Sequence, residues 1–194
     1  MSHVPPTGAP NRPKPAVSVE QPLAIDRVQP AEAWAQTGGI ASWLIAQGFG
    51  PQSAPVAILS GDSPERALFF FGALRAGVLV ASVDFASLDH ALDTIEPALV
   101  FAQDSRTYGA ALDRAQARGA RIVTADGKRG LALAALAACS IDAAVAERRL
   151  HITADTPAEI QFTGPSGAPG RRPRTHGDLA EFAAPPAILA GGNG

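Results

Sequence analysis

The fold class is indicated by residues 55–83, PVAILSGDSPERALFFFGALRAGVLVASV. Its first apolar run, Pro55–Ser60, predicts a short buried strand. Ser63 offers an N-cap and Pro64 suits the first position of a helix, so a helix should follow. A second apolar run, Val78–Val83, predicts another strand. A strand, a helix and a strand in this order indicate two parallel strands joined by a right-handed crossover.

The same alternation continues on both sides of this unit. A continuous apolar strand of this kind is typical of a sheet covered by helices on its faces. We therefore expect an α/β fold, a mostly parallel sheet with flanking helices. The other expected elements are a helix at Pro30–Gln47, a helix at Ser87–Glu96, a strand at Ala98–Ala102, a helix at Thr107–Arg118, a strand at Arg121–Thr124, short helices at Leu131–Ala138 and Ala143–Arg149, and a closing strand at Ala158–Phe162.

The composition is that of a globular protein. The 194 residues are 46% apolar and 18% charged, with a net charge of −2, so neither nucleic acid nor an anionic membrane is an expected partner. The longest apolar run, Ala67–Val83, is interrupted by Arg75 and by glycines and predicts no membrane span. The single cysteine, Cys139, excludes a disulfide framework, and without a secretory pattern we expect a cytoplasmic protein.

Three regions are expected along the chain. Residues 1–22 contain six prolines and few large apolar residues, so we expect a disordered tail. Residues 30–183 carry the strand and helix patterns and form the folded domain. Residues 184–194 are expected to be a flexible tail.

The stretch AEIQFTGPSGAPGRRPRTH, Ala158–His176, leads from a buried strand into a loop of small and hydroxyl residues and then into arginines. Small residues let backbone N–H groups approach an anion, hydroxyls donate further hydrogen bonds and cations balance the charge. The loop would lie at the carboxyl ends of the strands, where ligands of such sheets gather. The alternative is an ordinary Gly- and Pro-rich turn. The candidate phosphate-binding residues are Thr163, Ser166 and Gly167.

Three blocks of the sequence, residues 55–83, 89–104 and 155–179, together resemble the N-terminal part of the AMP-forming acyl-CoA synthetases. The resemblance is greatest to the feruloyl-CoA synthetase type. It implies a partial AMP-binding (adenylation) domain. It also implies a two-step reaction, in which a carboxylic acid is activated with ATP to an acyl-adenylate and the thiol of coenzyme A then displaces AMP. The cofactors implied are ATP, Mg²⁺ and coenzyme A.

The chain departs from the family pattern in its phosphate loop, which resembles T-S-G-S-T-G-x-P-K-G in relatives. Here the loop is one residue short, Pro165 replaces a flexible residue and Gly170 stands in the position of the lysine. Arg171 or Arg172 is a candidate to replace that cation, although a guanidinium and an ammonium differ in geometry. The regions that hold adenine, ribose and acyl group in relatives, and the domain with the catalytic lysine, have no counterpart. We therefore expect a truncated fragment that is inactive alone, and assign no catalytic residue.

Other functions are open from the sequence. The chain could be a non-catalytic α/β module that binds nucleotide weakly or associates with an intact homologue, or a product without a present function. A hydrolytic triad of Ser166, His176 and Asp178 is disfavoured because no nucleophile elbow is present. No G-x-G-x-x-G follows a strand, which disfavours a dinucleotide-binding domain. The four histidines and Cys139 lack metal-ligand spacing, so no metal site is assigned.

Overall fold

A parallel strand–helix–strand unit forms the centre of the protein. The computed structural model describes residues 31–163 and 170–182. Strand β1 (Val56–Leu59), helix α2 (Pro64–Arg75) and strand β2 (Val80–Val83) follow the predicted order. The two strands are parallel, with Val56 opposite Val80. Ser63 caps α2, because its hydroxyl accepts a hydrogen bond from the N–H of Arg66 at 3.1 Å.

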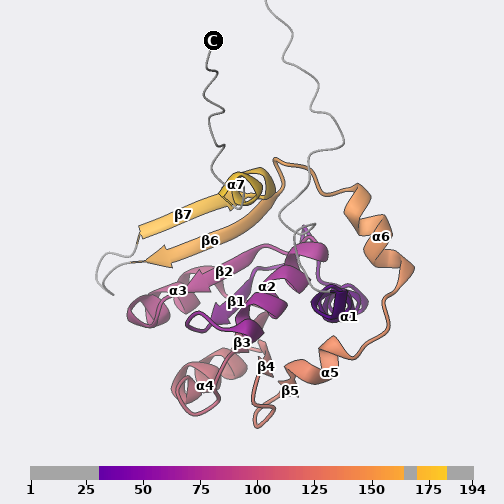
Figure 1. The fold of residues 1–194 in the computed structure, drawn as a ribbon. Helices are drawn as coiled ribbons and strands as arrows, with labels where there is room; N and C mark the ends of the chain where they lie inside the picture. The colour runs from indigo at the N-terminus through magenta and orange to yellow at the C-terminus, as the bar shows by residue number, and fades with distance from the viewer. Residues whose placement is uncertain (1–30, 164–169, 183–194) are drawn as a thin grey trace, which may run out of the picture.

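The sheet has seven strands in the order β5-β4-β3-β1-β2-β6-β7. All neighbouring strands are parallel except β6 and β7, which form an antiparallel hairpin. Figure 1 shows this hairpin at one end of the sheet, beyond β2. The predicted α/β class with a mostly parallel sheet is confirmed. The remaining strands are β3 (Leu99–Ala102), β4 (Arg121–Thr124), β5 (Leu131–Ala132), β6 (Pro157–Thr163) and β7 (Gly170–Thr175).

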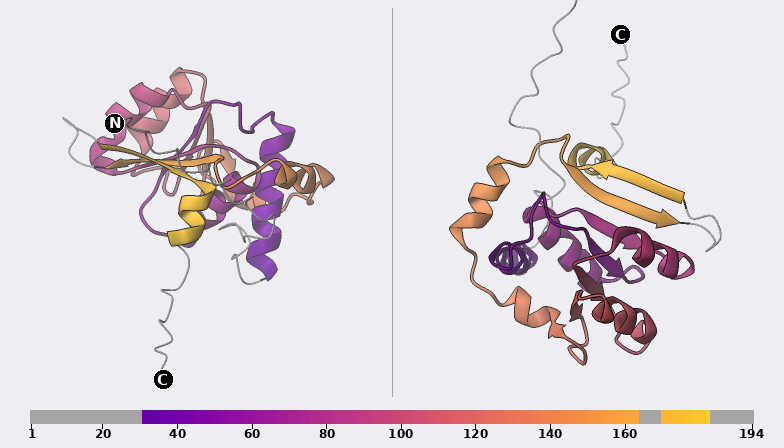
Figure 2. Two further views of the ribbon diagram at one scale, coloured as in Figure 1. Left: turned by 90° about the horizontal axis from the view of Figure 1, so that it is seen from above. Right: turned by 180° about the vertical axis from the view of Figure 1, so that it is seen from behind.

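Helices cover both faces of the sheet and divide the core into two clusters. One cluster packs residues of α1, α2, α5, α6 and α7 on one face, and the other packs residues of α3 and α4 on the opposite face. The views in Figure 2 show α6 beside α1 and α7 next to the hairpin. The helices are α1 (Ala31–Ala46), α3 (Leu88–Ile95), α4 (Gly109–Ala117), α5 (Leu133–Ala137), α6 (Ala143–Leu150) and α7 (His176–Phe182), with a 3₁₀ turn at Phe85–Ser87.

The centre of the first cluster is an aromatic pair. Phe69 of α2 and Phe101 of β3 are fully buried, and their rings stack with centroids 4.7 Å apart. Every residue of β1, β2 and β3 is buried. A sheet covered on both faces requires mainly apolar strands, and Ser82 is the one polar residue in these three, which is why the sequence pattern identified them.

A buried arginine joins α1 to α2. Arg75 donates from Nη1 to the carbonyl oxygen of Trp34 at 2.6 Å and to Oγ1 of Thr37 at 2.9 Å. Its guanidinium carbon also lies 3.8 Å from the centroid of the Trp34 ring, a cation–π contact. These contacts hold the first helix against the central unit.

Two sequence predictions about the elements are wrong. Leu131–Ala138 is not all helix, because Leu131 and Ala132 form strand β5 before α5 begins. The strand predicted at Ala158–Phe162 does not close the series, because β7 and α7 follow it. The sequence of β7, GRRPRT, has no apolar alternation, so its strand character comes from pairing with β6.

No helix in the described ranges is both long and apolar enough to cross a membrane. The apolar run Ala67–Val83 is divided between α2 and β2. The expected tails, 1–22 and 184–194, fall outside the described residues.

Candidate functional site

The candidate site begins where β6 reaches the carboxyl edge of the sheet. Val83, the last residue of β2, is the register partner of Phe162 in β6. Thr163 ends β6 and therefore lies at this edge. The N–H of Asp84 donates to the carbonyl oxygen of Phe162 at 3.3 Å, which keeps the chain leaving β2 beside the end of β6. The sequence placed Thr163 at the carboxyl edge and the structure agrees; its contact with a phosphate stays a prediction.

The other two candidate phosphate ligands, Ser166 and Gly167, lie outside the described residues. The residues that flank them in the structure, Thr163 and Gly170, are register partners in the β6–β7 hairpin. The chain therefore leaves the sheet and re-enters it at adjacent positions of its carboxyl edge.

The arginines that follow the predicted loop lie in strand β7. Arg172 is exposed and is the register partner of Gln161. Arg174 is bound to Glu159, with Nε and Nη2 donating to Oε2 at 3.0 and 2.6 Å. Of these two described side chains, only Arg172 is directed to solvent, because Arg174 belongs to a buried ion pair.

Sequence reasoning missed the polar network around Glu159. This carboxylate is 1% exposed and also accepts a hydrogen bond from Oγ of Ser82 at 2.6 Å. Arg66 Nη2 donates to the same hydroxyl at 3.3 Å, so the network joins α2, β2, β6 and β7. The signal was present in the sequence: a glutamate inside a buried strand requires a partner, because an unpaired buried charge is costly.

In the loops that follow β1, β3 and β4, polar side chains form hydrogen bonds with one another. Ser60 Oγ donates to Gln103 Oε1 at 3.0 Å, which joins the ends of β1 and β3. Ser105 donates from Oγ to Asp126 Oδ2 at 2.7 Å, and this hydrogen bond lowers the pKa of the Asp126 carboxyl to about 2. The backbone N–H of Thr107 likewise lowers the pKa of Asp104. These contacts fix the shape of the carboxyl edge.

The described residues hold no group of three His, Cys, Asp or Glu side chains arranged to bind a metal ion. Magnesium in nucleotide sites is held by one or two carboxylates together with the phosphates of the substrate. The exposed Asp84, next to the end of β6, fits such a partial ligand set.

The histidine of the disfavoured triad lies at the opposite edge of the sheet. His176 follows Thr175, which pairs with Pro157 at the start of β6, about 20 Å from Thr163 at 3.3 Å per residue. Asp178 exchanges hydrogen bonds with Thr175 as a helix cap, at 2.7 and 3.2 Å.

The His176 ring is completely buried, and neither nitrogen has a hydrogen-bond partner among the described residues. Burial and, secondarily, the charge of Arg149 lower the pKa of His176 to about 4. The ring is therefore neutral at pH 7. An unpartnered neutral imidazole and an aspartate used as a cap do not form a catalytic dyad.

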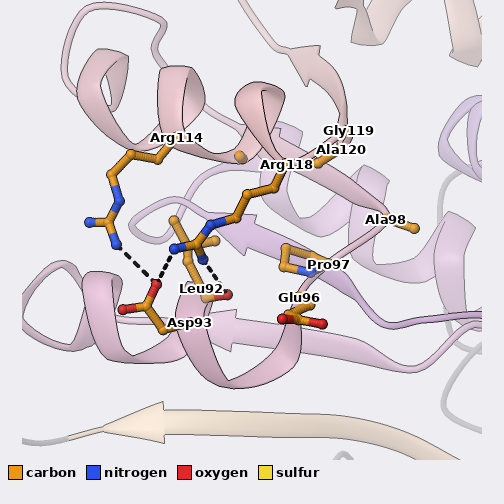
Figure 3. A pocket seen from close by; sticks show the side chains of 10 residues that line it. Leu92, Asp93, Glu96, Pro97, Ala98, Arg114, Arg118, Gly119 and Ala120 are labelled. Carbon is orange, nitrogen blue, oxygen red and sulfur yellow. Dashed lines mark hydrogen bonds and ion pairs between the residues drawn. The ribbon is translucent and has the colours of Figure 1, made fainter.

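A cavity of about 740 Å³ lies between α3 and α4. Its lining includes Ala98 and Ala120, which precede β3 and β4, so it opens at the amino edge of these strands. Figure 3 shows Arg114 and Arg118 both directed to Asp93, with Nη2–Oδ1 distances of 3.1 and 2.7 Å. This cavity is separate from the carboxyl edge, and its two arginines are both paired with Asp93.

The described geometry is that of an α/β domain whose β6–β7 hairpin reaches the carboxyl edge of the parallel strands. A family model described as AMP-binding enzyme matches residues 14–183. The chain belongs to the AMP-binding enzyme family. A comparison with curated proteins gave no match.

Solved structures support the same assignment. Apo MatB from Rhodopseudomonas palustris is 26% identical, with a TM-score of 0.63 over 80% of this chain and 31% of that one. ATP-bound MatB from the same organism is 28% identical, with a TM-score of 0.60 over 78% of this chain and 30% of that one. A fatty acyl CoA synthetase from Mycobacterium tuberculosis, 20% identical, shares the fold, with a TM-score of 0.58 over 75% of this chain and 28% of that one. The chain thus spans less than a third of the length of these three proteins.

Proposed function

We propose that this chain supplies the phosphate-binding part of an AMP-forming carboxylate–CoA ligase of the feruloyl-CoA synthetase type. Its substrate would be an aromatic or other hydrophobic acid, with ATP and coenzyme A as co-substrates. The observation that carries the proposal is the position of Thr163 at the carboxyl edge of a parallel sheet, within the region that matches the AMP-binding enzyme family. A MatB structure of 28% identity that contains ATP supports nucleotide binding in this fold. The lone Cys139 favours a reducing compartment such as the cytoplasm.

The proposed role of these residues is to hold the phosphates of ATP. Thr163 and Ser166 would donate hydroxyl hydrogen bonds to phosphate oxygens, and Gly167 would allow its backbone N–H to approach them. Adenylate formation needs chiefly the orientation of the phosphates and the stabilisation of their charge. Mg²⁺ would neutralise part of that charge, and the exposed Asp84, next to the end of β6, is a candidate to hold it.

We further propose that these 194 residues bind ATP without completing the reaction. The support is the extent of the match, which covers 30% of ATP-bound MatB. Coenzyme A and the acid enter this proposal through the family resemblance alone.

The test is an isothermal titration calorimetry experiment in which Mg–ATP is added to the purified chain. We expect saturable binding, and Thr163→Val should raise Kd by about tenfold or more, since a hydrogen bond to a charged group contributes about 1.5–3 kcal/mol. Thr94→Val is the matched control, because Thr94 is exposed on α3 and bonds to its own helix at His90.

ATP–pyrophosphate exchange with ferulate measures turnover in the same preparation. Exchange by the chain alone would contradict the proposed lack of catalysis. Absence of Mg–ATP binding at millimolar concentration, or equal Kd values for wild type and Thr163→Val, would contradict the phosphate-binding role.

A further inference from the structure

The register of strand β7 is not explained by its apolar residues. Its described side chains include the exposed Arg172 and Pro173, and an edge strand of this composition can pair in more than one register. The pairing already shifts by one residue at its start, because Pro157 opposes Thr175 while Glu159 opposes Arg174. Some other contact must select the observed register.

The contact between Glu159 and Arg174 has the required geometry. The two residues are direct register partners across the hairpin. The guanidinium donates twice to the same carboxylate oxygen, at 3.0 and 2.6 Å, and the other oxygen accepts from Ser82 at 2.6 Å. The two side chains are 1% and 16% exposed, so water competes little for them. A slip of one residue would leave this carboxylate buried without its cation, which is costly.

We propose that Glu159 and Arg174 are positioning residues whose ion pair selects the register of the β6–β7 hairpin. The same register makes Thr163 and Gly170 partners, so the pair also holds the two ends of the segment between them. Ser82 anchors the carboxylate to β2, which ties this register to the parallel part of the sheet. The consequence for phosphate binding rests on the function proposed above, whereas the consequence for the hairpin does not.

Nuclear magnetic resonance of the full chain without nucleotide tests the register directly. The readouts are the backbone nuclear Overhauser effects between Thr163 and Gly170 and the amide exchange rates of β6, compared with those of β1. The variants are Arg174→Met and Glu159→Gln/Arg174→Met, the second of which leaves no unpaired carboxylate if the first fails to fold. Arg172→Met is the matched control for exchange, because it removes the same charge from the same strand without touching Glu159.

In both Arg174 variants the nuclear Overhauser effects between Thr163 and Gly170 should disappear. The β6 amides should exchange about tenfold faster, because a charge-assisted pair is lost. The β1 amides should keep their rates, and Arg172→Met should leave both readouts unchanged. Wild-type effects and rates in both Arg174 variants would overturn the proposal. The proposal would also be overturned if amide exchange in β1 accelerated as much as in β6, or if neither variant folded. Either result would show that the ion pair stabilises the whole domain rather than selecting the register.

A titration with Mg–ATP then separates the two proposals. If the wild type binds Mg–ATP, Arg174→Met should raise Kd by about tenfold, and an unchanged Kd would overturn the link to phosphate binding. If the wild type does not bind, the proposed function fails while the resonance measurements still decide the role of the pair.

Discussion

In β1, β2 and β3 every side chain is buried, whereas the hairpin strand β7 presents Arg172 and Pro173 to solvent and holds Arg174 in an ion pair. The central strands are selected by apolar packing on both faces. In the hairpin, β6 buries Ala158 and Phe162 in the core, whereas β7 is an edge strand whose register we assign to the contact between Arg174 and Glu159. One sheet thus combines strands whose pairing is set by apolar packing with an edge strand whose register is set by a charged contact.

Stability should fall most when an aromatic ring is removed from the apolar region. Phe101→Ala removes a fully buried ring that stacks on Phe69. It should lower the free energy of unfolding by about 3–5 kcal/mol, from lost burial and the cavity left behind. Urea denaturation followed by circular dichroism measures this change.

Phe85→Ala is the matched control, since Phe85 is 66% exposed. Its effect should stay within about 0.5 kcal/mol. Similar losses in the two variants would show that the core does not depend on the stacked pair, and the comparison with the hairpin would fail.

Lowering the pH should reduce the free energy of unfolding by a smaller amount, through His176 at the end of the hairpin. His176 has a pKa of about 4 in the folded protein against 6.5 for an unperturbed histidine. The unfolded state therefore binds more protons between these values, so stability present above pH 6.5 is lost as the pH falls toward 4. Between pH 7 and pH 5 the free energy of unfolding should fall by about 2 kcal/mol.

Urea titrations at several pH values measure this loss. The variant His176→Gln should remove it, while His90→Gln, which changes an exposed ring, should retain it. An unchanged pH dependence in His176→Gln would show that another group is responsible.

The smallest effect is expected at the start of α2, in the apolar region. Ser63→Ala removes the hydroxyl that accepts from the N–H of Arg66 and should cost about 1 kcal/mol. Ser63→Asp keeps an acceptor and should remain near the wild type. A thermal melt of the three proteins measures both changes, and an Asp variant as unstable as the Ala variant would exclude capping as the cause.

The sequence predicted the parts of the fold that follow local physical rules. Val56–Leu59 and Leu99–Ala102 are continuous apolar runs, and Ser63 with Pro64 marks the beginning of a helix, so these elements were found within a residue or two. Strand β5 was missed because two residues, one of them the exposed Leu131, carry no periodicity. Such a strand forms only because β4 lies beside it.

The site was predicted only in outline. A strand leading to Thr163 could be read from its apolar residues, and so could its position at the carboxyl edge. Strand β7 could not, because its pairing depends on Arg174 meeting Glu159 fifteen positions away in the chain. Contacts of this kind have no local signature beyond the presence of a charge in a buried strand.

The contact of Arg75 with Trp34 also bears on the intrinsic fluorescence of this protein. The chain has two tryptophans, Trp34 and Trp43, and both lie on α1. Tryptophan fluorescence therefore reports on the packing of α1 and depends little on the hairpin. Separation of that helix ahead of the sheet would appear as a fluorescence transition that precedes the loss of ellipticity.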